Sequence, residues 1–382
     1  MRAPILQGMS LSDSERRRYA RHLALGEIGL AGQQRLKAAR VLVVGAGGLG
    51  SPAALYLAAA GVGTLGLLDC DRVELSNLQR QILFDTTLIG QNKADAGAAR
   101  LAQLNPEIRV RAHALELRAA NVLGVLADYH LVLDGSDRLA TRYLVNDACV
   151  LLKRPLVSGA IHRFEGQLFT YLPGSGPCYR CLFARPAEGL VGNCATAGVL
   201  GVLPGVIGAL QATEALKVIT GVGAPLSGRL LTYDALDMRF SEFHLPRRRD
   251  CAACGDAPSI TAPEDLPPMS PQAHAADIRR LSAADLEALL KTAARTPPPL
   301  IDVREVHEFN AGHLKGSVNI PLGQLPQRLG EIGDAPVFIC RSGGRSLAAC
   351  QMALAAAIAS PANLEGGLLG WAAAIDPALR VA

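Results

Sequence analysis

The chain has 382 residues, of which 49% are hydrophobic and 19% are charged. It is too long for a single hydrophobic core of ordinary size, so we expect two domains, each with a buried core. Its 38 basic and 34 acidic residues leave a formal net charge of +4, which by itself indicates neither a nucleic-acid partner nor a membrane partner. No stretch has the apolar run of a signal peptide or a membrane span, so we expect a cytoplasmic protein.

Strand-like apolar runs alternate with helical patterns from residue 40 to about residue 245. In chain order they predict a strand at RVLVVGA (40–46), a helix from Ser51, a strand at GTLGLLDCD (63–71), a helix from Lys93, a strand at RVRAHAL (109–115), a helix near Ala119 and a strand at YHLVLDGSD (129–137). This alternation predicts an α/β fold with a Rossmann-like doubly wound sheet.

A proline-rich stretch, GDAPSITAPEDLPPMSP, follows at residues 255–271; it lacks apolar periodicity and predicts a linker. A second α/β pattern begins at IRRLSAADLEALL (278–290), passes through PLIDVRE (299–305) and PVFIC (336–340), and ends with two helical runs. We therefore expect a first domain over 1–255, a linker over 256–277 and a small α/β domain over 278–382.

A glycine-rich turn follows the first predicted strand. VLVVGAGGLGS places Gly45, Gly47 and Gly50 in the GxGxxG spacing, where bare backbone can approach a phosphate at a helix N-terminus. Asp69 ends the next strand, at about the separation from which a carboxylate accepts hydrogen bonds from ribose hydroxyls. These features predict a nucleotide site, and they remain compatible with NAD or FAD.

Charged residues further along favour a triphosphate. SNLQRQ and GQNKA supply Arg80 and Lys93, for which a hydride-transfer site has no evident use. DGSD adds Asp134 and Asp137, either of which can hold Mg²⁺ beside phosphates. The alternative is that Arg80 and Lys93 are solvated surface charges. Together these motifs predict a site that splits ATP.

Residues 10–255 resemble the MoeB/ThiF family of E1-like adenylyltransferases, relatives of the ubiquitin-activating enzymes. The motifs that carry the resemblance include RYARH, GAGGLGS, DCDRVELSNLQRQ, GQNKA, LDGSDRLATRYLVND, SGAIHRFEGQ, CYRCLF and CAACG. The resemblance implies that ATP adenylates the C-terminal Gly-Gly of a ubiquitin-like sulfur-carrier protein and that pyrophosphate is released. In-line attack of a carboxylate on phosphate needs the positive charge that Mg²⁺, Arg and Lys supply.

The same resemblance assigns roles to individual residues. It makes Arg21 an arginine finger that reaches into the partner subunit's site, which implies a homodimer. It assigns Asp137 to Mg²⁺. The residues expected to contact the nucleotide are Gly45, Gly47, Gly48, Gly50, Asp69, Asn77, Arg80, Gln81, Lys93, Asp137 and Arg138. Two positions depart from the family's pattern, because Arg138 stands where Asn is usual and His22 where Gln is usual.

Four of the nine cysteines form two CxxC pairs, Cys178 with Cys181 and Cys251 with Cys254. Each pair presents two sulfurs on one tight turn, and two such pairs satisfy a tetrahedral Zn²⁺. The pattern therefore predicts a closed, structural zinc site; the alternatives are two redox pairs or two disulfides. The family resemblance agrees with zinc.

A fifth cysteine, Cys194, lies in the Gly-rich stretch GNCATAGVLG ahead of an apolar helix. Loops are where reactive groups are usually carried. In the matching family a cysteine at this place can link covalently to the carrier or form a disulfide with the sulfur donor. The alternative is an inert thiol, and whether Cys194 is essential stays open because an acyl adenylate is itself reactive.

The loop CRSGGR follows the strand PVFI and leads into a helix near Ser346. Its glycines let successive N–H groups turn inward around an anion, and the helix N-terminus adds to this, so a Cys340 thiolate is stabilised. The loop is too short to wrap a phosphate and suits a persulfide. With IDVREVHEFNAGHLKGSVNIPL it resembles the rhodanese sulfurtransferases over about residues 278–377. The resemblance implies that Arg341 and Arg345 supply positive charge beside Cys340.

The sequence thus predicts one polypeptide that adenylates a carrier and converts its carboxylate to a thiocarboxylate with sulfur from Cys340. The residues expected to be catalytic are Cys340, Cys194, Arg80, Arg21, Arg341 and Arg345. A cysteine desulfurase or thiosulfate would donate the sulfur, for molybdopterin, thiamin, cysteine, tRNA or related biosynthesis. Two alternatives stay open: an NAD- or FAD-dependent oxidoreductase fused to a rhodanese, and a noncatalytic scaffold that docks the carrier.

Overall fold

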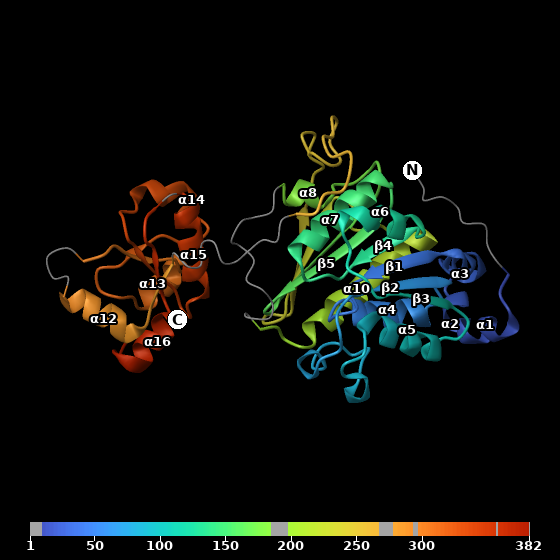
Figure 1. Cartoon of the computed structure of the whole chain (residues 1–382), viewed down its shortest axis with the longest axis horizontal. Coiled ribbons are helices and arrows are strands. Elements are labelled where there is room, and N and C mark those ends of the chain that lie inside the picture. Colours follow the sequence, from blue (N-terminus) through green and yellow to red (C-terminus); the bar gives the residue numbers. More distant parts are fainter. Residues whose placement is uncertain (1–9, 185–197, 267–277, 293–296, 357, 382) are drawn as a thin grey trace. The chain divides into compact units, whose positions relative to one another are not determined.

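The computed structural model describes residues 10–184, 198–266, 278–292, 297–356 and 358–381 (Figure 1). These residues form two compact units, one before residue 267 and one after residue 277. Within the described ranges, no helix is both long and apolar enough to cross a membrane.

The first unit is built on an eight-stranded sheet in the order β3-β2-β1-β4-β5-β6-β7-β8. Five strands are parallel: β1 (Arg40–Val44), β2 (Thr64–Leu68), β3 (Arg109–His113), β4 (Leu131–Asp134) and β5 (Leu156–His162). Three antiparallel strands extend them: β6 (Glu165–Tyr171), β7 (Arg229–Asp234) and β8 (Arg239–His244). The doubly wound prediction is confirmed, and the order of the parallel strands reverses beside β1, where such sheets bind nucleotides.

Helices cover both faces of the parallel strands (Figure 1). Val41 and Val43 of β1 pack into one core, with α4 (Gly50–Ala59), α5 (Lys93–Leu104) and α10 (Leu203–Thr220). Leu42 and Val44 face the other core, with α6 (Ala119–Ala127) and α7 (Leu139–Leu151). Because β1 is buried on both sides, its sequence is continuously apolar rather than alternating.

Short elements complete this unit. Before β1 stand α1 (Asp13–Arg18), α2 (Ala20–Leu23) and α3 (Gly29–Ala38), and later come η1 (Leu75–Asn77), η2 (Thr86–Leu88) and α8 (Tyr179–Leu182). Residues 256–266, which composition assigns to the linker, lie on this unit. Asp265 Oδ1 accepts a hydrogen bond of 2.8 Å from the backbone N–H of Ala119, and Ile260 and Leu266 pack against the α6–α7 core. A few apolar contacts hold this segment without any periodic pattern.

The second unit has a five-stranded parallel sheet in the order β11-β10-β12-β13-β9. Its strands are β9 (Arg279–Leu281), β10 (Leu300–Asp302), β11 (Val318–Asn319), β12 (Val337–Ile339) and β13 (Ala362–Leu364). The helices are α12 (Ala283–Thr292), α13 (Val306–Ala311), α14 (Leu325–Arg328), η3 (Leu329–Glu331), α15 (Gly344–Ala355) and α16 (Gly367–Ala374). Phe338 and Ile339 of the central strand β12 belong to different cores, so this sheet is also covered on both faces.

Candidate functional site

The glycine turn joins β1 to α4 at the carboxyl edge of the parallel strands. Gly45 has φ +86°, and a Cβ there would lie 3.0 Å from the carbonyl oxygen of Gly135, which follows β4. A Cβ on Gly50 would lie 1.8 Å from the carbonyl oxygen of Gly45. Only glycine fits at these two positions. The turn therefore brings the N-terminus of α4 to the strand-order reversal, as a phosphate site requires.

Asp69 lies directly beside this turn. Its Oδ2 accepts a hydrogen bond of 2.8 Å from the backbone N–H of Ala46, and its Oδ1 accepts one of 2.8 Å from the N–H of Asp71. Burial raises the pKa of Asp69, and these hydrogen bonds and the charge of Lys93 oppose that shift. The carboxylate is thus fixed next to the glycine turn, where the resemblance puts the ribose.

Arg80 and Gln81 approach the turn from the segment after η1. A Cβ on Gly48 would lie 3.6 Å from Arg80 Cγ, and one on Gly47 would lie 3.6 Å from Gln81 Nε2. Gln81 Oε1 is buried and has no hydrogen-bond partner among the residues described. Because an unsatisfied buried acceptor is costly, this oxygen suits a ligand that donates a hydrogen bond.

Two more predicted residues sit at the rim of the same edge. Lys93 is buried at the start of α5, and its Nζ lies 3.4 Å from Asp71 Oδ2. Asn77 is also buried, and its Oδ1 accepts a hydrogen bond of 3.3 Å from the N–H of Glu74. Lys93 therefore lies next to Asp69, whereas Asn77 holds its own loop in shape.

Asp134 and Asp137 have different surroundings, although their spacing makes them equal candidates and only the resemblance selects Asp137 for Mg²⁺. Asp134 is buried; its Oδ1 accepts hydrogen bonds from the N–H (3.0 Å) and Oγ–H (2.6 Å) of Ser136, and its Oδ2 accepts one from Ser158 Oγ (3.2 Å). Arg142 lies 3.8 Å from its Oδ2. Asp137 is exposed, and within the described ranges its carboxylate has no hydrogen bond or ion pair. Of these two aspartates, Asp137 is the one whose oxygens are free to contact a hydrated Mg²⁺, so its assignment to the ion stays a prediction.

Arg138 is exposed beside Asp137 and has its own partner. Its Nη1 lies 3.3 Å from Glu116 Oε1, in the loop that follows β3. The pair is more than half exposed on the arginine side and about half on the glutamate side, so it is weak and separable. A nucleotide contact by Arg138 stays a prediction.

Arg21 lies far from the glycine turn of its own chain. It belongs to α2, which packs at the C-terminal end of α4: the neighbouring His22 Nδ1 lies 3.0 Å from Gln33 Oε1, and Gln33 Nε2 donates to the carbonyl of Ala60. The turn is at the other end of this ten-residue helix, about 15 Å away by its rise. Arg21 is exposed and does not reach the glycine turn of its own chain, so its role as an arginine finger in a partner's site stays a prediction.

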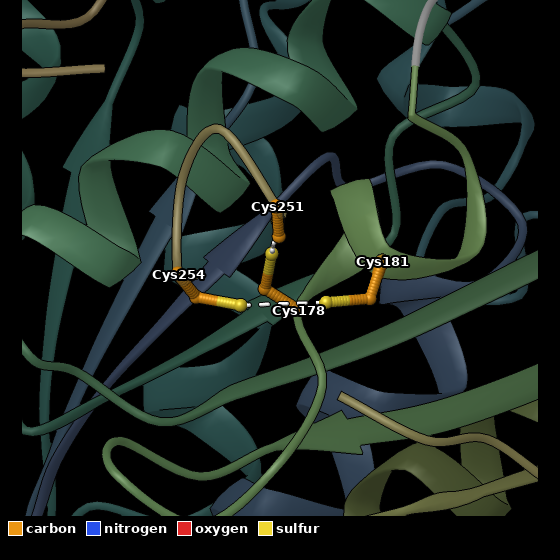
Figure 2. Close-up of side chains that lie close together, drawn as sticks. All are labelled: Cys178, Cys181, Cys251 and Cys254. Carbon is orange, nitrogen blue, oxygen red and sulfur yellow. Dashed lines mark hydrogen bonds between the residues drawn. The ribbon is translucent and has the colours of Figure 1, made fainter. Parts of the chain in front are cut away.

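The two CxxC pairs converge, as Figure 2 shows. Sγ atoms of Cys178 and Cys251 are 3.6 Å apart, those of Cys181 and Cys254 are 3.4 Å apart, and all four lie within 4.8 Å of one another. A tetrahedral zinc with Zn–S bonds of about 2.3 Å needs sulfurs separated by about 3.8 Å. The four sulfurs therefore fit a structural zinc ion.

Local chemistry supports this cluster. Hydrogen bonds among the four sulfurs shift their pKa values in opposite directions: they lower those of Cys181 and Cys251 and raise those of Cys178 and Cys254. The backbone N–H of Arg248 donates to Cys181 Sγ at 3.4 Å, and Arg180 at the base of the first pair forms a bidentate ion pair with Asp147. These contacts orient the ligands in the manner of a second coordination shell.

Cys251→Ser is expected to reduce bound zinc well below one ion per chain and to lower the melting temperature by about 10 °C, because a structural ion contributes to folding. Metal analysis and thermal unfolding measure the two effects. Cys350→Ala is the matched control, since Cys350 is a free thiol of the second unit that belongs to no cluster able to hold a metal among the described residues. A wild-type chain that contains disulfides and no zinc would contradict the assignment.

Cys194 falls in 185–197, outside the described residues, so its predicted role stays a prediction.

Cys340 is the first residue after β12 and begins the loop that leads to α15. Its Sγ accepts a hydrogen bond of 3.1 Å from the N–H of Gly343 and lies 3.2 Å from Ser346 Oγ. Gly343 has φ +94° and caps α15, which begins at Gly344. The loop therefore aims an N–H and a helix N-terminus at the sulfur.

The two arginines of the Cys340 loop differ in their contacts, which the sequence did not predict. Arg345 forms two hydrogen bonds to Glu308 of α13, at 2.6 and 2.7 Å, whereas Arg341 is exposed and has no side-chain partner among the described residues. Glu308 belongs to a capping box with Glu305, a local pattern that marks the start of α13 but not its contact with Arg345.

The fold and the two sites define a class: a nucleotide-binding α/β domain joined to a smaller domain with a reactive cysteine loop. The chain belongs to the ThiF family, whose model matches residues 19–254, and a model of the rhodanese-like domain matches residues 282–374. It is 44% identical over 407 residues to "Adenylyltransferase and sulfurtransferase MOCS3" of Bos taurus, covering 98% of this chain and 89% of that protein.

Two further comparisons agree. The MOCS3 protein of Aedes aegypti is 42% identical over 390 residues, covering 96% of this chain and 89% of that protein. The crystal structure of E. coli MccB with ATP shares the fold, with a TM-score of 0.56 and 24% identity over 64% of this chain and 75% of that chain. The fold class and the family predicted from the motifs are confirmed.

Proposed function

We propose that this chain adenylates a ubiquitin-like carrier protein with ATP and then transfers sulfur to it. The main support is the similarity of nearly the whole chain to proteins named adenylyltransferase and sulfurtransferase. Both candidate sites are also present in this one chain. This similarity favours neither an NAD- or FAD-dependent oxidoreductase nor a noncatalytic scaffold.

In the first reaction, an oxygen of the carrier's C-terminal carboxylate attacks the α-phosphorus of ATP, and pyrophosphate leaves. Asp69 accepts hydrogen bonds from the ribose, and Arg80 and Lys93 offset the repulsion between two anions. Asp137 would hold Mg²⁺, which neutralises phosphate charge. Arg21 of a second copy would reach this site, which makes the active form a homodimer.

In the second reaction, Cys340 carries the sulfur. Its thiolate takes a sulfur atom from the donor, and the resulting persulfide attacks the acyl carbon of the adenylate, so that AMP leaves. An acyl disulfide forms. A thiol, for which Cys194 is the candidate, attacks Cys340 Sγ and releases the carrier's thiocarboxylate; an external dithiol reduces the disulfide that remains.

Several finer assignments belong to this proposal. The carrier ends in Gly-Gly, and the donor is a cysteine desulfurase or thiosulfate. Zinc at the four cysteines is structural. We place the adenylation domain at 1–255, with residues 256–266 packed on it, and the rhodanese domain at 278–382.

The direct test supplies the purified chain with ATP, Mg²⁺, a sulfur donor and a carrier that ends in Gly-Gly. The expected product is a carrier whose intact mass has increased by one oxygen-to-sulfur replacement. Carrier-dependent exchange of labelled pyrophosphate into ATP reports the first step alone. Absence of both signals, with a carrier truncated by its last glycine as the negative control, would refute the proposal.

A further inference from the structure

The two arginines of the Cys340 loop have opposite surroundings, although the sequence gives them the same role. The Arg345 guanidinium faces the Glu308 carboxylate in a bidentate pair, with Nη1–Oε2 at 2.6 Å and Nη2–Oε1 at 2.7 Å. The Glu308 side chain is only 12% exposed. Arg341 is exposed, and none of the described residues pairs with its side chain. One cation is therefore neutralised in place and the other is uncompensated.

Glu308 is itself held firmly. Its Oε2 also accepts a hydrogen bond of 3.0 Å from the N–H of Glu305, which closes the capping box of α13. The hydrogen bonds from Arg345 lower the pKa of Glu308 to about 2, although burial opposes the shift and the nearby Arg304 supports it. Glu308 stays ionised at neutral pH, so the ion pair persists under assay conditions.

The helix that carries Glu308, α13, is anchored to the core of the domain. Arg304 and Asp302 form a completely buried ion pair with Nη2–Oδ2 at 2.7 Å, and the same Nη2 donates to the carbonyl of Gly312 after α13. Arg304 therefore ties the end of α13 to β10. A rigid α13 can fix the side chain that Glu308 holds, because bidentate arginine–carboxylate pairs have well-defined geometry.

Arg345 is the second residue of α15, so its contact with Glu308 holds the start of this helix. The first turn of α15 carries Ser346, whose Oγ lies 3.2 Å from Cys340 Sγ, and it is preceded by the N-cap Gly343, whose N–H donates to the same sulfur. Fixing the Arg345 side chain to α13 fixes the groups that surround the reacting sulfur.

We propose that Glu308 is a positioning residue for sulfur transfer, because it locks Arg345 into the frame of the Cys340 loop and leaves Arg341 as the cation that binds an anionic sulfur donor. This assignment rests on the proposed sulfurtransferase function. With thiosulfate as the probe, the Cys340 thiolate attacks the outer sulfur, a new S–S bond forms, and sulfite leaves with the electron pair of the broken S–S bond. Cyanide then removes the outer sulfur as thiocyanate and regenerates the thiolate.

The test measures kcat and KM of the full chain with thiosulfate and cyanide. Arg341→Gln is expected to raise KM for thiosulfate about tenfold with little change in kcat, since a charge-assisted contact to the donor is lost. Glu308→Gln is expected to lower kcat about tenfold with little change in KM. Simple charge screening predicts the opposite for Glu308→Gln, because removing a negative charge would lower KM for a dianion.

Two further variants separate positioning from charge. Arg345→Gln should reproduce the kcat loss of Glu308→Gln, and the double variant should lose no more than either single variant, because one contact is removed in all three. Glu331→Gln is the matched control: it breaks an exposed Arg328–Glu331 pair in the same domain and should change neither constant. A lower KM with an unchanged kcat in Glu308→Gln overturns the positioning role.

A second measurement needs no sulfur donor. Iodoacetate and iodoacetamide alkylate thiolates by the same reaction but differ in charge, and peptide mass spectrometry reports their rates at Cys340 alone. Arg341→Gln should lower the iodoacetate to iodoacetamide rate ratio several-fold, and an unchanged ratio overturns the donor-binding role. A wild-type chain that fails to transfer sulfur from thiosulfate counts against the proposed function with this donor, while the alkylation ratios still decide the role of Arg341.

Discussion

Cys340→Ala is expected to abolish sulfur transfer from thiosulfate to cyanide and to leave carrier-dependent pyrophosphate exchange at the wild-type rate. The thiolate is the nucleophile, so no other group in its loop can replace it. We assign the exchange reaction to residues of the first unit. Adenylation should therefore proceed when the sulfur-carrying atom is absent.

Cys350→Ala is the matched control for this variant. Cys350 lies on α15 of the same domain, but it is buried, and burial raises the pKa of its thiol to about 12. It should remain protonated and inert, so its removal should retain sulfur transfer. Loss of both activities in Cys340→Ala would show that the two reactions are not divided between the two domains.

Lys93→Ala and Asp137→Asn are expected to reduce pyrophosphate exchange by about 10²- to 10³-fold, because each removes a charge that acts on the reacting phosphates. The two effects should differ in their dependence on Mg²⁺. Extra Mg²⁺ should partly restore Asp137→Asn, whose site for the ion is weakened, and should not restore Lys93→Ala.

Asp128→Asn is the control for these variants, since Asp128 is exposed and pairs with Arg111 at 3.1 Å, away from the glycine turn. It should exchange pyrophosphate normally. Asp134→Asn should instead lower stability, because it removes a buried acceptor that three hydrogen bonds satisfy. Exchange at the full rate in either Lys93→Ala or Asp137→Asn would show that the nucleotide site is assigned to the wrong residues.

The sequence predicted the features that local chemistry determines. Buried parallel strands such as β1 and β4 need apolar side chains on both faces, so they appear as continuous apolar runs. The close approach of backbone at Gly50 leaves no room for a Cβ, so only glycine fits there. Each CxxC pair supplies two of the four sulfur ligands that a zinc ion needs. These patterns are short-range, which is why a single sequence reveals them.

Other features depend on residues that meet only in three dimensions. Asp134 and Asp137 are three residues apart and look equivalent, but Ser158 and Arg142 reach only Asp134. Arg345 was expected to supply positive charge for the anionic donor or for the persulfide, yet its partner Glu308 lies 37 positions earlier in the chain and was not visible from the sequence. Neither ion pairing nor burial can be read from spacing alone when the partners come from separate elements.

The four-sulfur cluster has a consequence for biosynthesis on the ribosome. Cys178 and Cys181 emerge long before Cys251 and Cys254, and the second pair closes the sequence of the first unit's ThiF match. A growing polypeptide therefore holds two unpaired soft ligands until translation of this unit is almost complete. We therefore expect the proposed zinc ion to complete its coordination only after this point, when all four cysteines have been synthesised.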